Sequence, residues 1–122
     1  MTESDTSLDE LRVLVVEDEL LIAMMLEEML EDYGCSVVGP CADVASALSS
    51  CETGDFDVAL IDMNLGGVPA TPVLEALDRA AIPYALSTGA DASGDNGALR
   101  LQKPFNNDDL QRVLRALQKR RG

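Results

Sequence analysis

Five side chains that could take part in chemistry follow short apolar runs of the sequence. Glu17 and Asp18 come directly after one run, and Asp62 ends another. Thr88 and Lys103 follow two further runs in the second half of the chain. Three converging carboxylates would repel one another unless a cation lay among them. Oxygen ligands without nitrogen or sulfur favour Mg²⁺ as that cation.

One type of reaction uses all five side chains. An aspartate carboxylate can act as a nucleophile and carry a phosphoryl group. The charge on the phosphoryl oxygens must then be neutralised, by a metal ion on one side and by a lysine or a hydroxyl on another. The pattern therefore predicts that Asp62 accepts a phosphoryl group, and that Lys103 and Thr88 assist it.

The apolar runs that must position these residues alternate with helical segments. Runs rich in Val, Leu and Ile are typical of parallel strands that are buried on both faces. The expected strands cover 13–16, 36–38, 58–61, 84–87 and 99–101, and the expected helices cover 20–33, 43–50, 71–80 and a segment from 107 onward. This alternation predicts a parallel sheet with helices on both faces, and sites in such sheets form at the carboxyl ends of strands.

Local signals predict where these elements begin and end. Gly39-Pro40 should end the second strand. Asp43 should cap the second helix, the Thr71 hydroxyl the third and Asn107 the last. The last helix carries one apolar stripe that should face the core, made of Leu110, Val113, Leu114 and Leu117.

The composition excludes several classes of protein. The net charge of −13 disfavours a nucleic-acid partner, because phosphate backbones require clustered Lys and Arg. No apolar run approaches the roughly 20 residues that cross a bilayer, and the acidic N-terminus does not resemble a signal peptide, so we expect a cytoplasmic protein without a membrane partner. The absence of histidine excludes a His-based triad, and three cysteines without a CxxC pair make a zinc site improbable.

These motifs together resemble the receiver domain of bacterial response regulators, the CheY-like family, from about residue 11 to residue 117. The resemblance implies an α/β, flavodoxin-like (βα)5 fold with a five-stranded parallel sheet of order 2-1-3-4-5. It implies that Asp62 is the phospho-acceptor, that Thr88 is the switch hydroxyl and that Lys103 is the family's invariant lysine.

The resemblance also implies the ligands of the metal. Mg²⁺ would be held by the carboxylates of Glu17, Asp18 and Asp62 and by the backbone carbonyl of Asn64. The segment from Asp62 to Gly67 is similar to that of a subset of receivers with an Asn-Leu-x-Gly turn, many of which are single-domain proteins.

Two features depart from the family's pattern. Receivers carry an aromatic residue three positions before the lysine, whereas this chain carries Arg100. We expect Arg100 to pair with an acid such as Asp91 or Asp95 and to change partner on phosphorylation. The segment 89–97 is rich in helix breakers, so the fourth helix of the family should be short or degenerate here.

The expected organisation is a flexible acidic N-terminal tail (1–10), a receiver domain (11–119) and a short C-terminal tail (120–122). The expected function is that of a stand-alone response regulator. A histidine kinase or histidine phosphotransferase would supply its phosphoryl group, and a downstream protein target would read the result. Such a protein catalyses only its own phosphorylation and dephosphorylation, so it is not classed as an enzyme.

Several alternatives stay open from the sequence. The chain could be a phosphate sink, a relay shuttle or a pseudo-receiver that is never phosphorylated. A phosphatase of the haloacid-dehalogenase type would need a second Asp two residues after the nucleophile, and Asn64 occupies that position.

Overall fold

The computed structural model describes residues 8–88, 99–102 and 105–120; at Thr88 and Gln102 the description covers the backbone only. Five parallel strands form one sheet in the order β2-β1-β3-β6-β7. In chain order these are β1 (Arg12–Val16), β2 (Ser36–Cys41), β3 (Val58–Asp62), β6 (Tyr84–Thr88) and β7 (Leu99–Gln102). Counting only these strands, the order is the predicted 2-1-3-4-5, so the predicted fold class is confirmed.

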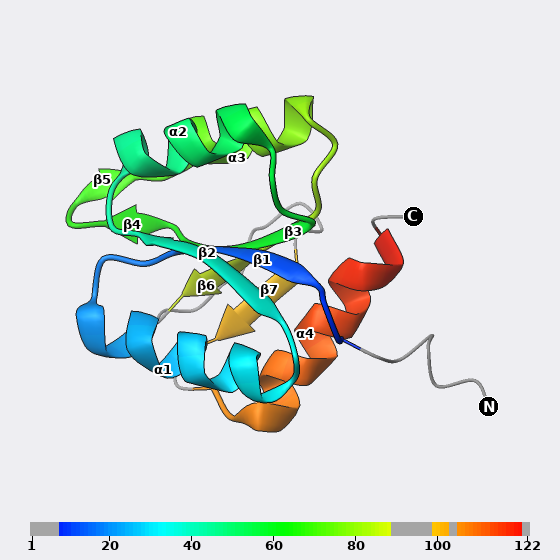
Figure 1. The fold of residues 1–122 in the computed structure, drawn as a ribbon. Helices are drawn as coiled ribbons and strands as arrows, with labels where there is room; N and C mark the ends of the chain where they lie inside the picture. Colours follow the sequence, from blue (N-terminus) through cyan, green and yellow to red (C-terminus); the bar gives the residue numbers. More distant parts are fainter. Residues whose placement is uncertain (1–7, 89–98, 103–104, 121–122) are drawn as a thin grey trace.

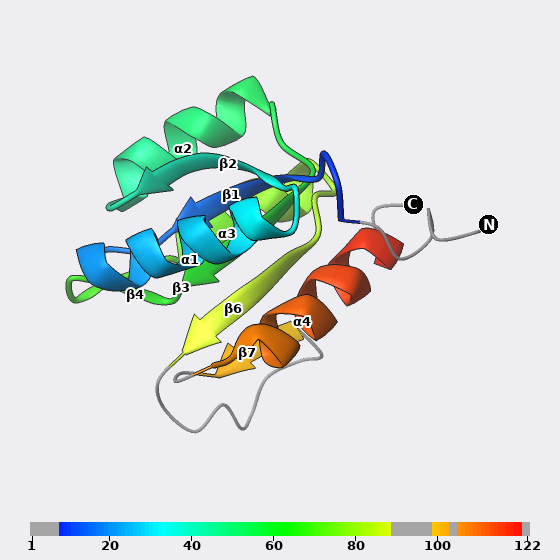
Figure 2. The same cartoon turned by 60° about the horizontal axis from the view of Figure 1, so that its bottom comes forward.

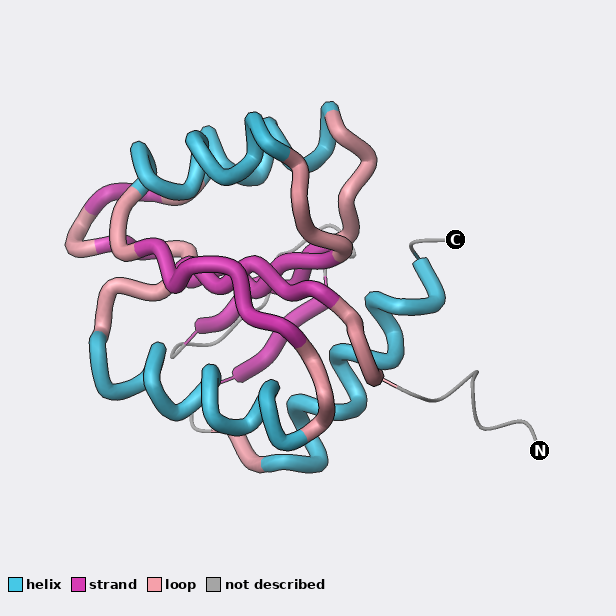
Figure 3. Tube along the Cα trace, in the orientation of Figure 1, coloured by secondary structure: helices cyan, strands magenta, loops and turns pink. Residues whose placement is uncertain are grey.

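Helices cover both faces of the sheet (Figures 1 and 3). α2 (Val44–Thr53) and α3 (Thr71–Arg79) lie on one face, whereas α1 (Leu20–Asp32) and α4 (Asn107–Arg120) lie on the other. The helix that the resemblance placed between β6 and β7, and that we expected to be short, falls in segment 89–98, outside the described residues. None of the helices in the described part has the length and apolar character that crossing a lipid bilayer requires.

Alternation along the strands separates two apolar cores. Val13, Val15 and Leu60 pack toward α1 and α4, whereas Leu14 and Ile61 pack toward α2 and α3. The predicted stripe of α4 is buried in the first core, with Leu110, Leu114 and Leu117 at 0% and Val113 at 4% exposure. Continuous apolar runs in β1 and β3 are explained by this burial on both faces.

The second strand continues past its predicted end. We expected Gly39-Pro40 to stop it, but β2 runs through to Cys41. A proline is tolerated there because β2 is an edge strand. On the outer side of an edge strand no backbone N–H is needed for hydrogen bonds to a neighbouring strand. Gly39 is required, because its φ is +95° and a Cβ would lie 2.8 Å from the Cys41 nitrogen.

Two of the three predicted helix caps are wrong by one residue. Asp43 caps α2 as expected, since its Oδ1 accepts the Ser46 N–H at 2.8 Å. For α3 the N-cap position is Ala70, which makes no side-chain cap hydrogen bond, and Thr71 already lies inside the helix. For α4 the cap is Asn106, whose Oδ1 accepts the Asp109 N–H at 2.9 Å.

The segment after β3 is a hairpin where the sequence suggested a plain loop. β4 (Asn64–Leu65) pairs antiparallel with β5 (Val68–Pro69). Gly66 and Gly67 form the turn with φ values of +62° and +91°, which a tight hairpin of this kind demands of its two central residues. The Asn64 side chain accepts the Gly67 N–H at 2.7 Å and closes the turn.

Leu8 lies in the segment that the sequence analysis assigned to an N-terminal tail, yet it packs against the domain. Leu8 is only 5% exposed and packs in the core that α1 and α4 cover. An apolar residue in an acidic segment thus belongs to the domain, while residues 1–7 lie outside the description.

Candidate functional site

The carboxyl ends of the central strands bring three acidic side chains together. Glu17 follows β1 directly, Asp18 is its neighbour, and Asp62 is the last residue of β3. One carboxylate oxygen of each lies within 4.8 Å of the others. The structure therefore assembles the three carboxylates that the sequence predicted to converge.

The parallel register explains the convergence. Val16 of β1 lies opposite Ile61 of β3, so the residues that follow each of them leave the sheet at the same edge. β3 and β1 are central strands, and their apolar residues are almost fully buried. The strand positions, and with them the acids at their ends, are thus fixed by the packing of both cores.

Two of the three acids are buried. Glu17 is 2% and Asp62 is 9% exposed, whereas Asp18 is partly exposed. Burial of charged groups costs free energy unless opposite charge or hydrogen bonds compensate. The arrangement of three carboxylate oxygens within one small volume suits a hard divalent cation such as Mg²⁺. These residues fit the predicted cofactor.

Backbone N–H groups hold two of these carboxylates in place. The N–H of Glu19 donates to Glu17 Oε2 at 3.1 Å, and the N–H of Asn64 donates to Asp62 Oδ1 at 3.0 Å. Both donors come from the turn that follows each acid, so the strand ends themselves orient the carboxylates.

The β4–β5 hairpin borders the same cluster. A Cβ at Gly66 would lie 3.7 Å from Asp18 Oδ2, so the turn of the hairpin approaches the acidic pair closely. Figures 1 and 2 show the hairpin and the start of α1 at the edge of the sheet where the strands end. The hairpin contains Asn64, which the resemblance placed in the site, but the sequence analysis did not predict that β4 pairs with β5.

The remaining predicted site residues lie at the neighbouring strand ends or beyond the description. Thr88 is the last residue of β6, opposite Gln102 of β7, and its side chain is not among the described ones. Lys103 lies outside the described residues. Arg100 is partly buried on β7, opposite Leu86, and its expected partners Asp91 and Asp95 are also outside the description.

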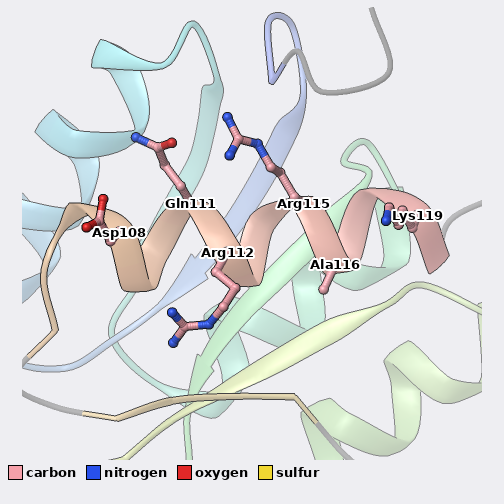
Figure 4. A pocket seen from close by; sticks show the side chains of 6 residues that line it. All are labelled: Asp108, Gln111, Arg112, Arg115, Ala116 and Lys119. Atoms are coloured by element: carbon pink, nitrogen blue, oxygen red, sulfur yellow. The ribbon is translucent and has the colours of Figure 1, made fainter. Parts of the chain in front are cut away.

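A hollow elsewhere on the surface differs in character from the cluster of three acids. It runs along the exposed side of α4 (Figure 4) and contains none of the clustered acids. Its lining residues are Asp108, Gln111, Arg112, Arg115, Ala116 and Lys119. Three positive side chains face a single carboxylate in this hollow, so it suits a cation less well than the cluster of three acids does.

Nothing in the sequence singled out Ser87, yet the structure places it beside Asp62. It is the residue of β6 that pairs with Asp62 of β3, and it is 2% exposed. A serine within an apolar strand gives no signal of its own; only the register of the two strands reveals this neighbour.

Comparison with known proteins identifies the family. The family model described as the response regulator receiver domain matches residues 13–115. The transcriptional regulatory protein TcrA of Mycobacterium tuberculosis is 34% identical to this chain in an alignment that covers 89% of this chain and 46% of TcrA. This chain thus spans about half the length of the curated relatives it matches.

Solved structures agree with the fold. SdrG from Sphingomonas melonis Fr1 has a TM-score of 0.79 and 42% identity, covering 89% of this chain and 97% of SdrG. The receiver domain of the sensor histidine kinase PA1611 from Pseudomonas aeruginosa has a TM-score of 0.78 and 26% identity, covering 88% of this chain and 97% of that domain. That structure holds a magnesium ion coordinated in its active-site cleft. This chain belongs to the response regulator receiver domain family.

Proposed function

We propose that this receiver domain accepts a phosphoryl group on Asp62 from a phosphohistidine of a partner protein. The observation that carries the proposal is the convergence of Glu17, Asp18 and Asp62 at the carboxyl ends of β1 and β3. The acceptor stands at the end of a buried strand, where its carboxylate is both oriented and reachable from the edge of the sheet.

The transfer is a single displacement. A carboxylate oxygen of Asp62 attacks the phosphorus, the P–N bond of the phosphohistidine breaks, and its electron pair stays on the histidine nitrogen. The Asn64 N–H, 3.0 Å from Asp62 Oδ1, keeps the carboxylate in one orientation during the attack.

The other residues of the site would balance charge. Mg²⁺ held by Glu17, Asp18, Asp62 and the Asn64 carbonyl would neutralise charge on the phosphoryl oxygens. We assign Lys103 and Thr88 to the same oxygens, as the family resemblance implies. The chain would thereby catalyse its own phosphorylation and dephosphorylation.

Exposed apolar side chains next to the site support a protein as the donor. Within the described residues, the large apolar side chains that are exposed all belong to α1 and β5, namely Leu20, Leu21, Met24, Met25 and Val68. Leu20 and Leu21 are 71% and 79% exposed and follow Asp18 by two and three residues. A small phosphodonor has no use for this surface, whereas a helical donor protein can bury it.

The direct test is phosphorylation with acetyl phosphate and Mg²⁺, followed by intact-mass measurement. We expect one acid-labile phosphoryl adduct on the wild type and none on Asp62→Asn. Asp55→Asn is the matched control, because it makes the same change at an exposed acid near the amino ends of the strands, away from the cluster. An adduct on Asp62→Asn, or none on the wild type, would contradict the proposal and favour a pseudo-receiver.

The donor surface can be tested separately. Leu21→Asp should leave labelling by acetyl phosphate unchanged and should slow labelling by a phosphorylated histidine phosphotransfer protein at least severalfold. Equal slowing with both donors would show that the substitution damages the site itself. We extend the proposal to a downstream protein that reads the phosphorylated state by direct contact.

A further inference from the structure

The hydroxyl of Ser87 is buried without a hydrogen bond. Ser87 lies in β6 and is 2% exposed, so bulk water does not reach it. Its Oγ has no hydrogen-bond partner among the described residues. A buried donor that makes no hydrogen bond costs free energy, and native proteins rarely leave one in place.

Ser87 is a direct neighbour of the acceptor. The register pairs Ser87 with Asp62 across two adjacent parallel strands, which lie about 4.8 Å apart in such sheets. Ala85 and Leu60, two residues earlier on each strand, both belong to the core that α1 and α4 cover. Since side chains alternate between faces, Ser87 and Asp62 leave their strands on the same face of the sheet.

Phosphorylation would change what surrounds this hydroxyl. In the described part of the structure the Asp62 Oδ1 atom accepts the Asn64 N–H, and Ser87 Oγ makes no hydrogen bond. A phosphoryl group on Asp62 brings three strong acceptor oxygens to this position. The state with the phosphoryl group is then the one in which the Ser87 donor is satisfied.

We propose that Ser87 is a further phosphoryl-binding residue, whose hydroxyl donates a hydrogen bond to the acyl phosphate on Asp62 and lengthens its lifetime. The inference rests on the proposed function, because it requires that Asp62 be phosphorylated. It assigns a role to a residue separate from Thr88, the hydroxyl that the family resemblance identifies.

The direction of the effect follows from the hydrolysis step. A water oxygen attacks the phosphorus, the bond from phosphorus to the Asp62 oxygen breaks, its electron pair returns to the carboxylate, and a proton of the water passes to solvent. As the bond from phosphorus to the Asp62 oxygen breaks, the phosphoryl group moves away from Asp62 and from the strand that holds Ser87. A hydrogen bond aligned to the adduct is therefore weakened on the way to the transition state, so the Ser87 donor stabilises the adduct more than the transition state and hydrolysis slows.

Ser87→Ala removes the donor and leaves the carboxylates in place. We expect its acyl phosphate, formed with acetyl phosphate and Mg²⁺, to decay about threefold to tenfold faster than that of the wild type. We also expect beryllofluoride with Mg²⁺, a stable mimic of the phosphoryl group, to raise the Tm of Ser87→Ala less than that of the wild type. Without either reagent the variant should be at least as stable as the wild type, because no hydrogen bond is lost.

Two further variants separate the donor from packing. Ser87→Cys keeps nearly the same volume with a much weaker donor, so it should behave like Ser87→Ala, and it serves in its place if the alanine variant does not fold. Ser50→Ala removes a hydroxyl of α2 that lies 3.6 Å from Cys41 Sγ, and it should match the wild type in lifetime.

Three results would overturn the inference. Equal decay rates in wild type and Ser87→Ala show that the hydroxyl does not contact the phosphoryl group. A lower Tm of Ser87→Ala before phosphorylation shows that the hydroxyl already has a partner. No adduct on the wild type overturns the proposed function as well, so the failure of the two proposals can be told apart.

Discussion

Acidic side chains lie at both ends of the parallel sheet, and their surroundings differ. At the amino ends of β1 and β3, Arg12 binds Asp55 at 2.7 Å and Asp57 at 3.1 Å. Asp55 is 78% exposed in its side chain, and the two acids raise the pKa of Arg12 through hydrogen bonds and charge. The chain itself supplies the positive charge here, in contact with solvent, and the contacts tie the start of β1 to the segment before β3.

At the carboxyl ends of the same strands, the acids converge instead of being spread around a guanidinium. Glu17 and Asp62 are buried, and with Asp18 they place three carboxylate oxygens within 4.8 Å. The comparison teaches that acidic composition does not identify a site, because the chain has 22 acidic residues. Convergence of acids together with their burial does identify a site, because the buried cluster concentrates negative charge where solvent screens it least.

The largest effect should come from neutralising a buried acid of the cluster. Glu17→Gln keeps the shape of the side chain and the acceptor for the Glu19 N–H, but removes one negative charge. We expect the affinity for Mg²⁺ to fall at least about tenfold. The measurement is the rise of Tm during titration with MgCl₂. Glu28→Gln, at an exposed position of α1, is the control and should leave the affinity for Mg²⁺ unchanged. Equal affinities in the wild type, Glu17→Gln and Glu28→Gln would show that the acids at the carboxyl end of the sheet do not form a cation site.

A smaller effect of opposite sign is expected without a cation. Asp18→Asn should raise the free energy of unfolding in EDTA by about 1 kcal/mol, because it relieves repulsion between carboxylates less than 5 Å apart. Denaturant unfolding measures this change, and Mg²⁺ should abolish the advantage of the variant. A destabilised Asp18→Asn in EDTA would mean that its charge is compensated within the chain.

The smallest effect belongs to the amino end. Arg12→Gln breaks an exposed ion pair, so we expect a slight fall in Tm at low salt that shrinks as NaCl screens the charges. The affinity for Mg²⁺ should not change, because the pair lies at the amino ends of the strands and the acid cluster at their carboxyl ends. A fall in Tm that persists in high salt would assign a packing role to Arg12.

The sequence predicted the strands and the acids best where one physical cause dominates. The apolar runs of β1 and β3 can only be buried on both faces, and this fixes the edge at which Glu17, Asp18 and Asp62 meet. The roles of Lys103 and Thr88 stay predictions, because they concern side chains outside the description.

Two local features and one tertiary contact were missed by the sequence analysis. The cap of α4 was placed at Asn107 because both Asn106 and Asn107 suit that position, and the reciprocal hydrogen bonds between Asn106 and Asp109 decide between them. The hairpin after β3 was not foreseen, since four residues of strand carry no recognisable alternation. Leu8 joined the core although its neighbours in the sequence are polar.

The path of β2 has a consequence for how this protein behaves at high concentration. β2 is an edge strand, and an edge offers unpaired backbone groups to any strand of another molecule. Pro40 lacks the N–H that such an intruder would need, and the positive φ of Gly39 interrupts the regular extended backbone beside it. The residues that hid the full length of β2 from sequence analysis therefore protect the protein against edge-to-edge aggregation, and replacing Pro40 with valine should lower its solubility.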